Sequence, residues 1–276
     1  MITILTATYN RAHTLNRLFS SLEAQSDKRF KWVVVNDGST DNTIELLQGF
    51  QEIASFPITV LSQKNSGKHV AINTGLASTT DEWVFLVDSD DLLTHNAVEI
   101  FHGDSFNISD DHIVSFCYRK ADLAGQLIGK LIAEEDGKSA YMTPTEASNF
   151  YKGDLAYIFR TRTLLKYPFP SFVDEKFVPE LLIWNRVADD GQVLFFHHQI
   201  IYLCEYLDDG YSANFIHNLR RNPRGFGIYY KSQINRESSI IRKVKCVIRY
   251  LQCLFFLLIK KPDLGSVRKP KKYDFL

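Results

Sequence analysis

The sequence predicts an α/β fold in which a mainly parallel, Rossmann-like sheet is flanked by helices. Two observations predict this fold. Over roughly the first hundred residues, short apolar runs alternate with helical patterns of 3.6-residue period, which is typical of βαβ units. The runs are also almost continuously apolar, as in Trp32-Val33-Val34-Val35, and this is typical of strands buried on both faces of a parallel sheet.

The N-terminal elements follow one another at short intervals. The first helix has apolar residues at helical spacing, and we expect Thr14 to cap it. Asp41 is expected to begin the second helix, and a third helix is expected from about residue 69 to residue 77. The expected strands are residues 2–6, 31–36, 58–61 and 83–87.

The second half of the chain is less regular. Pro179 suits the first position of a helix that continues through Val187. No linker rich in Pro, Gly or Ser separates the halves, so we expect one continuous structure with parts at 1–104 and 105–215, followed by a helical, basic segment at 216–276. The expected strands of this half are residues 113–118, 155–160, 193–196 and 200–206.

The composition is that of an ordinary globular chain and gives no argument for a nucleic-acid partner. The 276 residues are 45% hydrophobic and 23% charged, and 32 basic residues balance 32 acidic ones. The four cysteines show no metal-ligand spacing, so we expect buried, reduced thiols. No signal-peptide pattern follows Met1, and no segment is long and apolar enough to span a bilayer. These observations predict a cytoplasmic protein.

The segment from Val84 to Asp91 is an apolar run that ends at three carboxylates. Because side chains alternate along a strand, Asp88 and Asp90 should leave its end on the same face. Two such oxygen ligands suit Mg²⁺ or Mn²⁺ shared with phosphate oxygens. The alternative is that Asp90 or Asp91 caps a helix beginning near Thr94, and we interpret Asp91 as that cap.

Phosphate must be held without a glycine-rich fingerprint, because neither G-x-G-x-x-G nor G-x-x-x-x-G-K-[ST] follows an expected strand. Lys68 and the backbone amides around Ser66 and Gly67 are the candidates, since glycine allows close approach. Asp37 follows the second strand, where it can accept from a ribose hydroxyl or a base N–H. An Asx turn over Gly38 is the structural alternative for Asp37.

Five segments resemble, in order and at suitable spacing, the motifs of family 2 glycosyltransferases: residues 6–11, 35–41, 63–67, 71–76 and 88–91. The resemblance covers residues 2 to about 95. It implies a GT-A fold and inverting transfer from a nucleotide sugar, usually UDP-linked. It also implies that Thr8 and Asp37 contact the nucleoside, Asp88 the ribose or the metal, and Asp90 the metal. The expected donor-binding set is Thr8, Tyr9, Asn10, Asp37, Asn65, Gly67, Lys68, Asp88 and Ser89, with Mn²⁺ or Mg²⁺ at Asp88 and Asp90.

Inversion requires a carboxylate that takes the proton from the attacking hydroxyl. The segment from Phe177 to Asn185 resembles the family's acidic motif at the start of a helix, which indicates Glu180 as the catalytic base. Many relatives have Glu-Asp here, whereas Leu181 follows Glu180 in this chain. An acid in the first turn of a helix is also favoured by the helix dipole alone. The reserve candidates are Asp174 and Glu175.

A second departure from the family pattern follows the expected strand at 200–206. Some relatives have an arginine and a histidine there, whereas this chain is acidic. Glu205 or Asp209 could approach the metal, but we favour a solvated turn before Gly210. The adjacent pair His197 and His198 is interpreted as structural.

The C-terminal segment joins positive charge to an apolar helix. From Arg242 to Lys272 the chain has ten basic residues and a single acid, Asp263. Between the basic clusters, residues 247–259 are too few to cross a membrane and too apolar for an exposed helix. We expect an interfacial helix whose flanking lysines meet anionic lipid. The alternative is a helix packed on its own domain with a solvated basic tail.

Together these features predict an inverting, metal-dependent glycosyltransferase that extends a glycan or polyprenyl-linked acceptor at the inner face of the cell membrane. Residues 1–104 are the expected donor half and 105–215 the acceptor half, in which residues 153–160 resemble bacterial surface-polysaccharide enzymes. A nucleotidyltransferase is one alternative, but residues 7–10 lack the Gly- and Arg-rich loop that it needs. A non-catalytic nucleotide-sugar-binding protein is the other, and the acids at 88, 90 and 180 argue against it.

Overall fold

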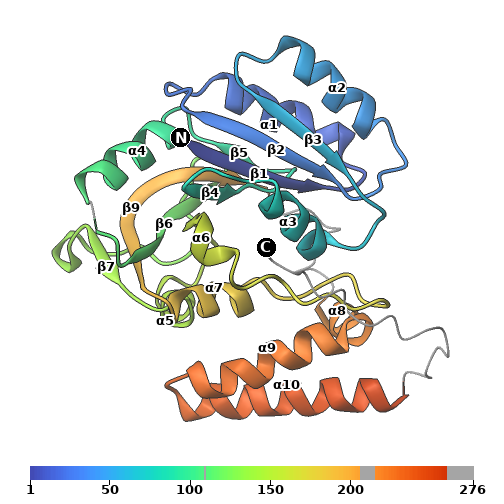
Figure 1. The fold of residues 1–276 in the computed structure, drawn as a ribbon. Coiled ribbons are helices and arrows are strands. Elements are labelled where there is room, and N and C mark those ends of the chain that lie inside the picture. Colours follow the sequence, from blue (N-terminus) through green and yellow to red (C-terminus); the bar gives the residue numbers. More distant parts are fainter. Residues whose placement is uncertain (109, 206–214, 260–276) are drawn as a thin grey trace.

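A computed structural model of the chain describes residues 1–108, 110–205 and 215–259. Its central feature is a nine-stranded sheet with helices on both faces (Figure 1), which confirms the predicted α/β class. The strands are β1 (Ile2–Thr8), β2 (Phe30–Asn36), β3 (Ile58–Ser62), β4 (Trp83–Leu86), β5 (Leu92–Leu93), β6 (Ile113–Asp122), β7 (Ser139–Tyr141), β8 (Leu155–Arg160) and β9 (Gln192–Cys204). They lie in the order β3-β2-β1-β4-β8-β6-β9-β5, and β7 pairs with β9.

The helices connect and cover these strands. In the N-terminal half they are α1 (Ala12–Glu23), α2 (Thr43–Ile53), α3 (Lys68–Ala77) and α4 (Ala97–Asn107). The remaining helices are the 3₁₀ turn η1 (Glu134–Asp136), α5 (Pro144–Tyr151), α6 (Thr161–Leu164), α7 (Leu181–Ala188), α8 (Phe215–Arg221), α9 (Pro223–Arg236) and α10 (Ile240–Ile259).

The parallel part of the sheet is its N-terminal half. Strand β1 pairs in parallel with β2 and β4, and β2 pairs in parallel with β3. The second half is mixed, because β8 is antiparallel to both β4 and β6, whereas β6 and β9 are parallel. The predicted strands 193–196 and 200–206 are one strand, β9. The polar segment His197-His198-Gln199 suggested a break, but the backbone continues through it with register shifts against β6.

Alternation along the strands fills two cores, one on each face of the sheet. In β2, Trp32 and Val34 face the core shared with α1, α2 and α4, whereas Val33 and Val35 face the core shared with α3, α5 and α7. The indole N–H of Trp32 donates to Thr6 Oγ1 at 3.0 Å, so its buried polar group is satisfied. Both faces of β2 are therefore buried in apolar cores, which explains its continuous apolar sequence.

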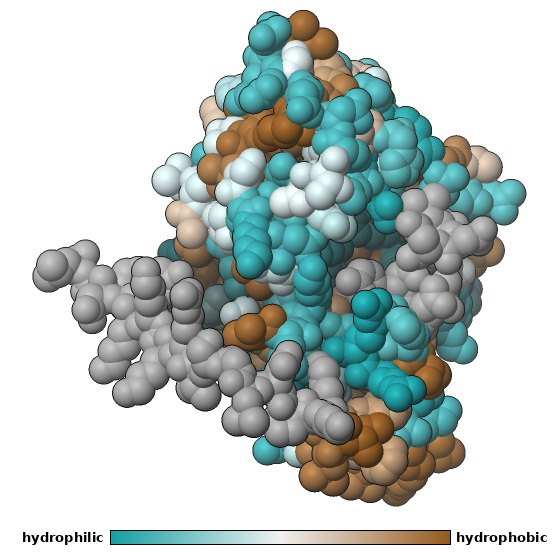
Figure 2. Space-filling view, turned by 90° about the vertical axis from the view of Figure 1, so that its right-hand side faces the viewer, coloured by the Kyte–Doolittle hydropathy of each residue, from teal (hydrophilic) through white to brown (hydrophobic). Residues whose placement is uncertain are grey.

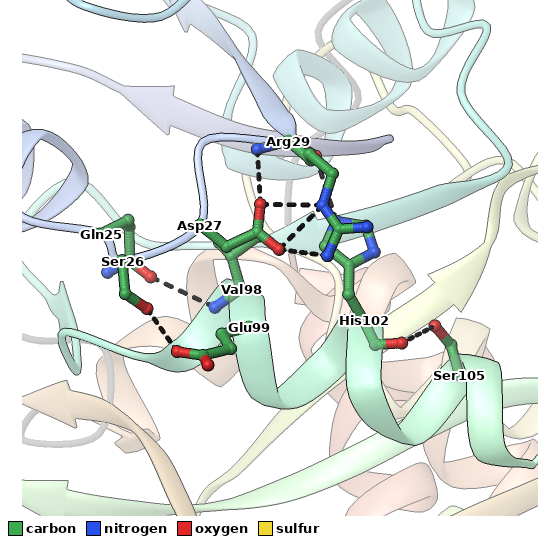
Figure 3. A network of polar contacts seen from close by, with 8 residues as sticks. All are labelled: Gln25, Ser26, Asp27, Arg29, Val98, Glu99, His102 and Ser105. Atoms are coloured by element: carbon green, nitrogen blue, oxygen red, sulfur yellow. Dashed lines mark hydrogen bonds and ion pairs between the residues drawn. The ribbon is translucent and has the colours of Figure 1, made fainter.

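The amino end of the sheet is held by a surface network (Figure 3). Ser26 Oγ donates to Glu99 Oε2 at 2.7 Å, and the backbone N–H of Val98 donates to Gln25 Oε1 at 3.2 Å. Asp27 pairs with Arg29, and this hydrogen bonding lowers the pKa of the Asp27 carboxyl. The network ties the segment before β2 to α4, far from the carboxyl ends of the parallel strands.

Two predicted helix starts are wrong by a few residues. Helix α1 begins at Ala12, and Thr14 lies in its first turn, where its hydroxyl donates to the carbonyls of Arg11 and Ser89. Helix α2 begins at Thr43, and Asp41 stands before it and accepts from the Thr43 N–H and hydroxyl. In both cases the polar side chain bonds near the helix end, but Thr14 lies three residues after the N-cap residue of α1 and Asp41 lies two residues before the first residue of α2.

Helices α8, α9 and α10 form a separate layer beneath α7, with α9 and α10 lying side by side (Figure 1). Glu175 anchors this layer, because its buried carboxylate accepts from the backbone N–H groups of Arg224 and Gly225 at the start of α9. Among the described helices, none is both long and apolar enough to cross a membrane. The four cysteines are free and buried, as predicted.

Candidate active site

The predicted site residues gather where the parallel strands end. Thr8 ends β1, Asp37 follows β2, and Asp88 follows β4, so all three lie at the same edge of the sheet. The backbone N–H of Asp37 donates to the carbonyl of Thr8 at 2.8 Å, which joins the first two of these strand ends directly.

Asp37 binds the loop before α3. Its Oδ1 accepts from the Ser66 N–H at 2.8 Å and from Gln63 Nε2 at 2.7 Å, and its Oδ2 accepts from the Gly67 N–H at 2.7 Å. The loop over Gly38 is closed by the preceding residue instead, since Asn36 Oδ1 accepts from the Ser39 N–H, three residues on. A carboxylate has about four acceptor sites, so three protein donors leave capacity for one more. The nucleoside role of Asp37 stays a prediction.

Two of the predicted donor-contacting residues have buried polar atoms that lack a protein partner. Among the described residues, neither Thr8 Oγ1 nor Asn65 Oδ1 has a hydrogen-bond partner. Such atoms are costly to leave unsatisfied, and they are common where a ligand supplies the missing bond. Both belong to the strand-end loops, Thr8 at the end of β1 and Asn65 just before α3.

The other predicted donor residues have different surroundings. Asn10, with a positive φ of 52°, uses its side-chain oxygen to accept from the Thr40 N–H at 2.8 Å, so it shapes the loop after β2. Tyr9 is exposed, and Ser89 is buried with its carbonyl bonded to Thr14.

Gly67 occupies a position that no other residue suits. Its φ is +97°, and a Cβ placed on it would lie 2.2 Å from the carbonyl oxygen of Lys176. The loop before α3 therefore approaches the segment that leads into α7 at backbone distance. This contact brings the start of α3 next to the start of α7.

Replacing Gly67 with alanine is expected to lower the melting temperature by about 5 °C or more and to weaken UDP binding, because the two backbones must separate. The matched control is Gly49→Ala in α2, where a Cβ meets open space and should be neutral or slightly stabilising. Thermal unfolding and calorimetric UDP titration would check both. Equal behaviour of the two variants would show that the contact does not hold the loop.

Lys68 pairs with two of the predicted site acids, the proposed metal ligand Asp88 and the proposed base Glu180. Its Nζ lies 2.6 Å from Asp88 Oδ1 and 2.7 Å from Glu180 Oε1. All three side chains remain a little over one-third exposed, so they line an open site. Burial opposes the charge of Lys68, but the charges of Asp88 and Glu180 outweigh it and raise the lysine pKa. The start of α3, the end of β4 and the start of α7 thus meet at one ammonium group.

The acidic turn after β4 is positioned by Tyr202 of β9. The Tyr202 hydroxyl accepts from the Asp88 N–H at 2.9 Å and donates to Asp91 Oδ2 at 2.7 Å. The predicted capping role of Asp91 is therefore wrong: α4 begins at Ala97, after Asn96, and Asp91 is buried against Tyr202. Burial and the charge of Asp88 raise the pKa of Asp91 to about 7.

Asp88 and Asp90 suit a metal that is shared with substrate. In residues 1–108, 110–205 and 215–259, no three acidic, histidine or cysteine side chains gather as a complete metal cage. Desolvation and the nearby charge of Asp88 raise the pKa of Asp90. A bound cation would relieve this repulsion between the two carboxylates. Two carboxylates with an open side fit Mg²⁺ or Mn²⁺ completed by phosphate oxygens.

A cavity of about 350 Å³ opens beside this cluster. Its lining includes Asp88, Glu180 and Lys120. Lys120 lies near the end of β6, with its Nζ 3.8 Å from the Tyr202 ring centroid. The remaining lining residues are Ser148, Gly153, Asp154, Leu155, Tyr157, Leu181 and Trp184. The sequence gives no signal for Lys120 and Tyr202 as site residues, because their position beside the cavity depends on the pairing of β6 with β9.

The reserve acids have other partners. Asp174 pairs with Arg224, and Glu175 caps α9, so both hold the C-terminal helices. Glu205 pairs with Arg17 at 2.8 Å, and Asp209 lies outside the described residues. His197 is buried, with its Nδ1 2.7 Å from the Tyr151 hydroxyl, as expected for a structural histidine.

Helix α7 begins at Leu181, and Glu180 is its N-cap residue rather than part of the first turn after Pro179. The Glu180 carbonyl accepts from Ile183 and Trp184, whereas its carboxylate makes no capping hydrogen bond. The side chain points to Lys68 instead. A role as helix cap therefore does not explain this acid.

The family model for glycosyl transferase family 2 matches residues 3–119. This part of the chain is therefore similar to family 2 glycosyltransferases. It is 29% identical to the poly(ribitol-phosphate) beta-N-acetylglucosaminyltransferase TarP of Staphylococcus aureus over 196 residues, covering 68% of this chain and 54% of TarP. It is also 29% identical to glycosyltransferase GlyA of Streptococcus pneumoniae over 151 residues, covering 55% of this chain and 22% of GlyA. The chain thus spans about a fifth to a half of these relatives.

Solved structures agree on the fold. TarS of S. aureus in complex with UDP-GlcNAc superposes with a TM-score of 0.64 at 19% identity, covering 92% of this chain and 72% of that one. The mannosyltransferase PcManGT of Pyrobaculum calidifontis, in complex with GDP-Man and Mn²⁺, gives 0.59 at 17% identity, covering 93% and 74%. The GT-A fold and the resemblance to this glycosyltransferase family are confirmed.

Proposed function

We propose that this glycosyltransferase moves a sugar from a UDP-linked donor to a hydroxyl of a glycan or lipid-linked acceptor, with inversion and with a divalent metal. The observation that carries the proposal is the pairing of Lys68 with Asp88 and Glu180, two acids that line the cavity. The donor class is supported by relatives whose structures contain UDP and UDP-GlcNAc.

The donor is placed at the strand ends. Thr8, Asn65 and Asp37 supply free acceptor capacity around the nucleoside, and the backbone amides of the loop before α3 lie beside it. Lys68 lies between this loop and the acids, where its ammonium group can pair with a diphosphate oxygen. A metal at Asp88 and Asp90 would neutralise the diphosphate as it leaves.

The acceptor enters the cavity lined by Glu180. Its hydroxyl oxygen attacks the anomeric carbon as the bond from that carbon to the diphosphate oxygen breaks, and the hydroxyl proton passes to the Glu180 carboxylate. Tyr202 is a positioning residue, because its hydroxyl holds the backbone of Asp88 and the side chain of Asp91. A single displacement of this kind inverts the anomeric centre.

The proposal is tested by incubating the full chain with a panel of UDP- and GDP-linked sugars and Mn²⁺, and measuring binding and slow donor hydrolysis. No acceptor is needed. We expect one UDP-sugar to bind and to be hydrolysed. Binding of none of the donors would overturn the proposed activity.

Replacing Asp37 with alanine is expected to weaken UDP and uridine binding by similar factors, about tenfold each, if its carboxylate contacts the nucleoside. Gln63→Ala is the matched control, since it removes one donor to Asp37 but keeps the carboxylate. Calorimetric titration with both ligands distinguishes the roles. Unchanged uridine affinity in Asp37→Ala would assign the residue to the loop alone.

A further inference from the structure

Helix α10 is apolar on two opposite sides. One side, with the buried Cys246 and Cys253, packs against α9. Residues three or four apart share a helix face, and the opposite side exposes an outward stripe whose members are each 51 to 85% accessible. The outward stripe is Ile241, Val244, Ile248, Leu251, Phe255 and Leu258.

This stripe is unusual for a surface helix. A helix that has packed one face normally presents polar residues to water, and a contiguous exposed apolar patch indicates an interaction site. Figure 2, which looks toward the end of α10, shows hydrophobic residues gathered at the base of the molecule over the α9 and α10 layer. The patch is larger than single exposed residues elsewhere, such as Ile53 or Phe106.

The charge around the stripe identifies its partner. Residues 215–259 contain nine lysines and arginines and one acid, Glu237. Lys243 and Lys245 lie next to the stripe on its two sides. Basic residues beside an apolar helix face are complementary to anionic headgroups above an acyl layer.

We propose that α10 docks the protein on an anionic phospholipid surface, lying flat with the outward stripe in the acyl boundary and the lysines at the phosphates. Its 20 residues make a helix of about 30 Å, enough for a broad contact parallel to the surface. A second copy of the chain is a poorer occupant, because two such basic layers facing each other would repel.

The layer that carries the stripe is connected to the helix that follows Glu180. Ile228 and Tyr229 of α9 pack against the core that contains Leu182 and Ile183 of α7, and Glu180 is the N-cap residue of α7. Docking through α10 would therefore hold α7 and Glu180 close to the lipid surface. This step, which would bring a lipid-linked acceptor to Glu180, rests on the proposed function, whereas the docking itself does not.

The test uses the full chain and co-sedimentation with phosphatidylcholine vesicles, with or without phosphatidylglycerol. We expect binding only when phosphatidylglycerol is present, and Leu251→Gln/Phe255→Gln should weaken it about tenfold or more. The matched control, Ile53→Gln/Phe106→Gln, removes exposed apolar residues from α2 and α4 and should bind as the parent does. Lys243→Gln/Lys245→Gln should weaken binding about fivefold for each lysine, in a salt-dependent manner.

Donor hydrolysis should be unchanged in all three variants, so a failure of docking is distinguishable from a failure of the proposed activity. If the stripe variant does not fold, as judged by circular dichroism, the lysine variant still tests the charge. Unchanged vesicle binding in both α10 variants would overturn the proposal. A dimer in sedimentation velocity that the stripe substitutions dissociate, without vesicle binding, would assign the stripe to a second copy and overturn it as well.

Discussion

Replacing Glu180 with glutamine is expected to lower sugar transfer about a thousandfold while UDP affinity stays within about threefold of the parent. The amide keeps the size of the side chain and can still accept a hydrogen bond from Lys68 Nζ, now 2.7 Å away. It cannot take the proton of the acceptor hydroxyl. Single-turnover transfer and calorimetric UDP titration would separate the two effects.

Asp154 provides the matched control, since it lines the same cavity and could be mistaken for the base. Asp154→Asn should change acceptor affinity more than the rate of transfer. If Asp154→Asn abolished transfer and Glu180→Gln did not, Asp154 and not Glu180 would be the catalytic base. Parallel losses of UDP affinity and rate in Glu180→Gln would instead mark Glu180 as a support for Lys68.

The parts of the fold that could be predicted depend on local pattern. Buried parallel strands are rich in apolar residues, so β2 and β4 are recognisable from the sequence, and the βαβ spacing locates β1 and the half-buried edge strand β3. The carboxyl ends of β1, β2 and β4 then place Thr8, Asp37 and Asp88 together. The predicted helix starts differ from the observed ones by a few residues. A Thr or Asp side chain near a helix end can form hydrogen bonds with groups other than the helix N–H groups that a cap satisfies. Thr14 does so when its hydroxyl reaches the carbonyl of Ser89.

The parts that could not be predicted are contacts between distant segments. Asp37 lies 30 residues along the sequence from Gly67, whose N–H donates to its carboxylate. Tyr202 lies 114 residues from Asp88, whose N–H donates to its hydroxyl. Lys68 could be expected near phosphate, but its pairing with Glu180 depends on how α7 sits against α3. No periodicity reports such contacts, since each is set by sheet order and by close backbone approach at Gly67.

Replacing Asp90 with asparagine is expected to lower turnover on the order of a hundredfold or more and to remove the Mn²⁺ dependence of UDP binding, because the diphosphate loses part of its counter-charge. The metal-free variant should also be slightly more stable. Desolvation and Asp88 raise the pKa of Asp90 above its ordinary value, so the ionised carboxylate destabilises the fold as pH rises past that value. The gain should appear near neutral pH and shrink in acid.

Thermal unfolding across pH, together with Mn²⁺ titration at fixed UDP, measures both halves of this expectation. Glu52→Gln on the exposed side of α2 removes an equal charge far from the site and controls for net charge. Activity of the parent enzyme at its full level in EDTA would contradict the metal role. Higher stability with lost activity is the combination expected of acids held close together for a bound cation, since a purely structural aspartate would lose stability on substitution.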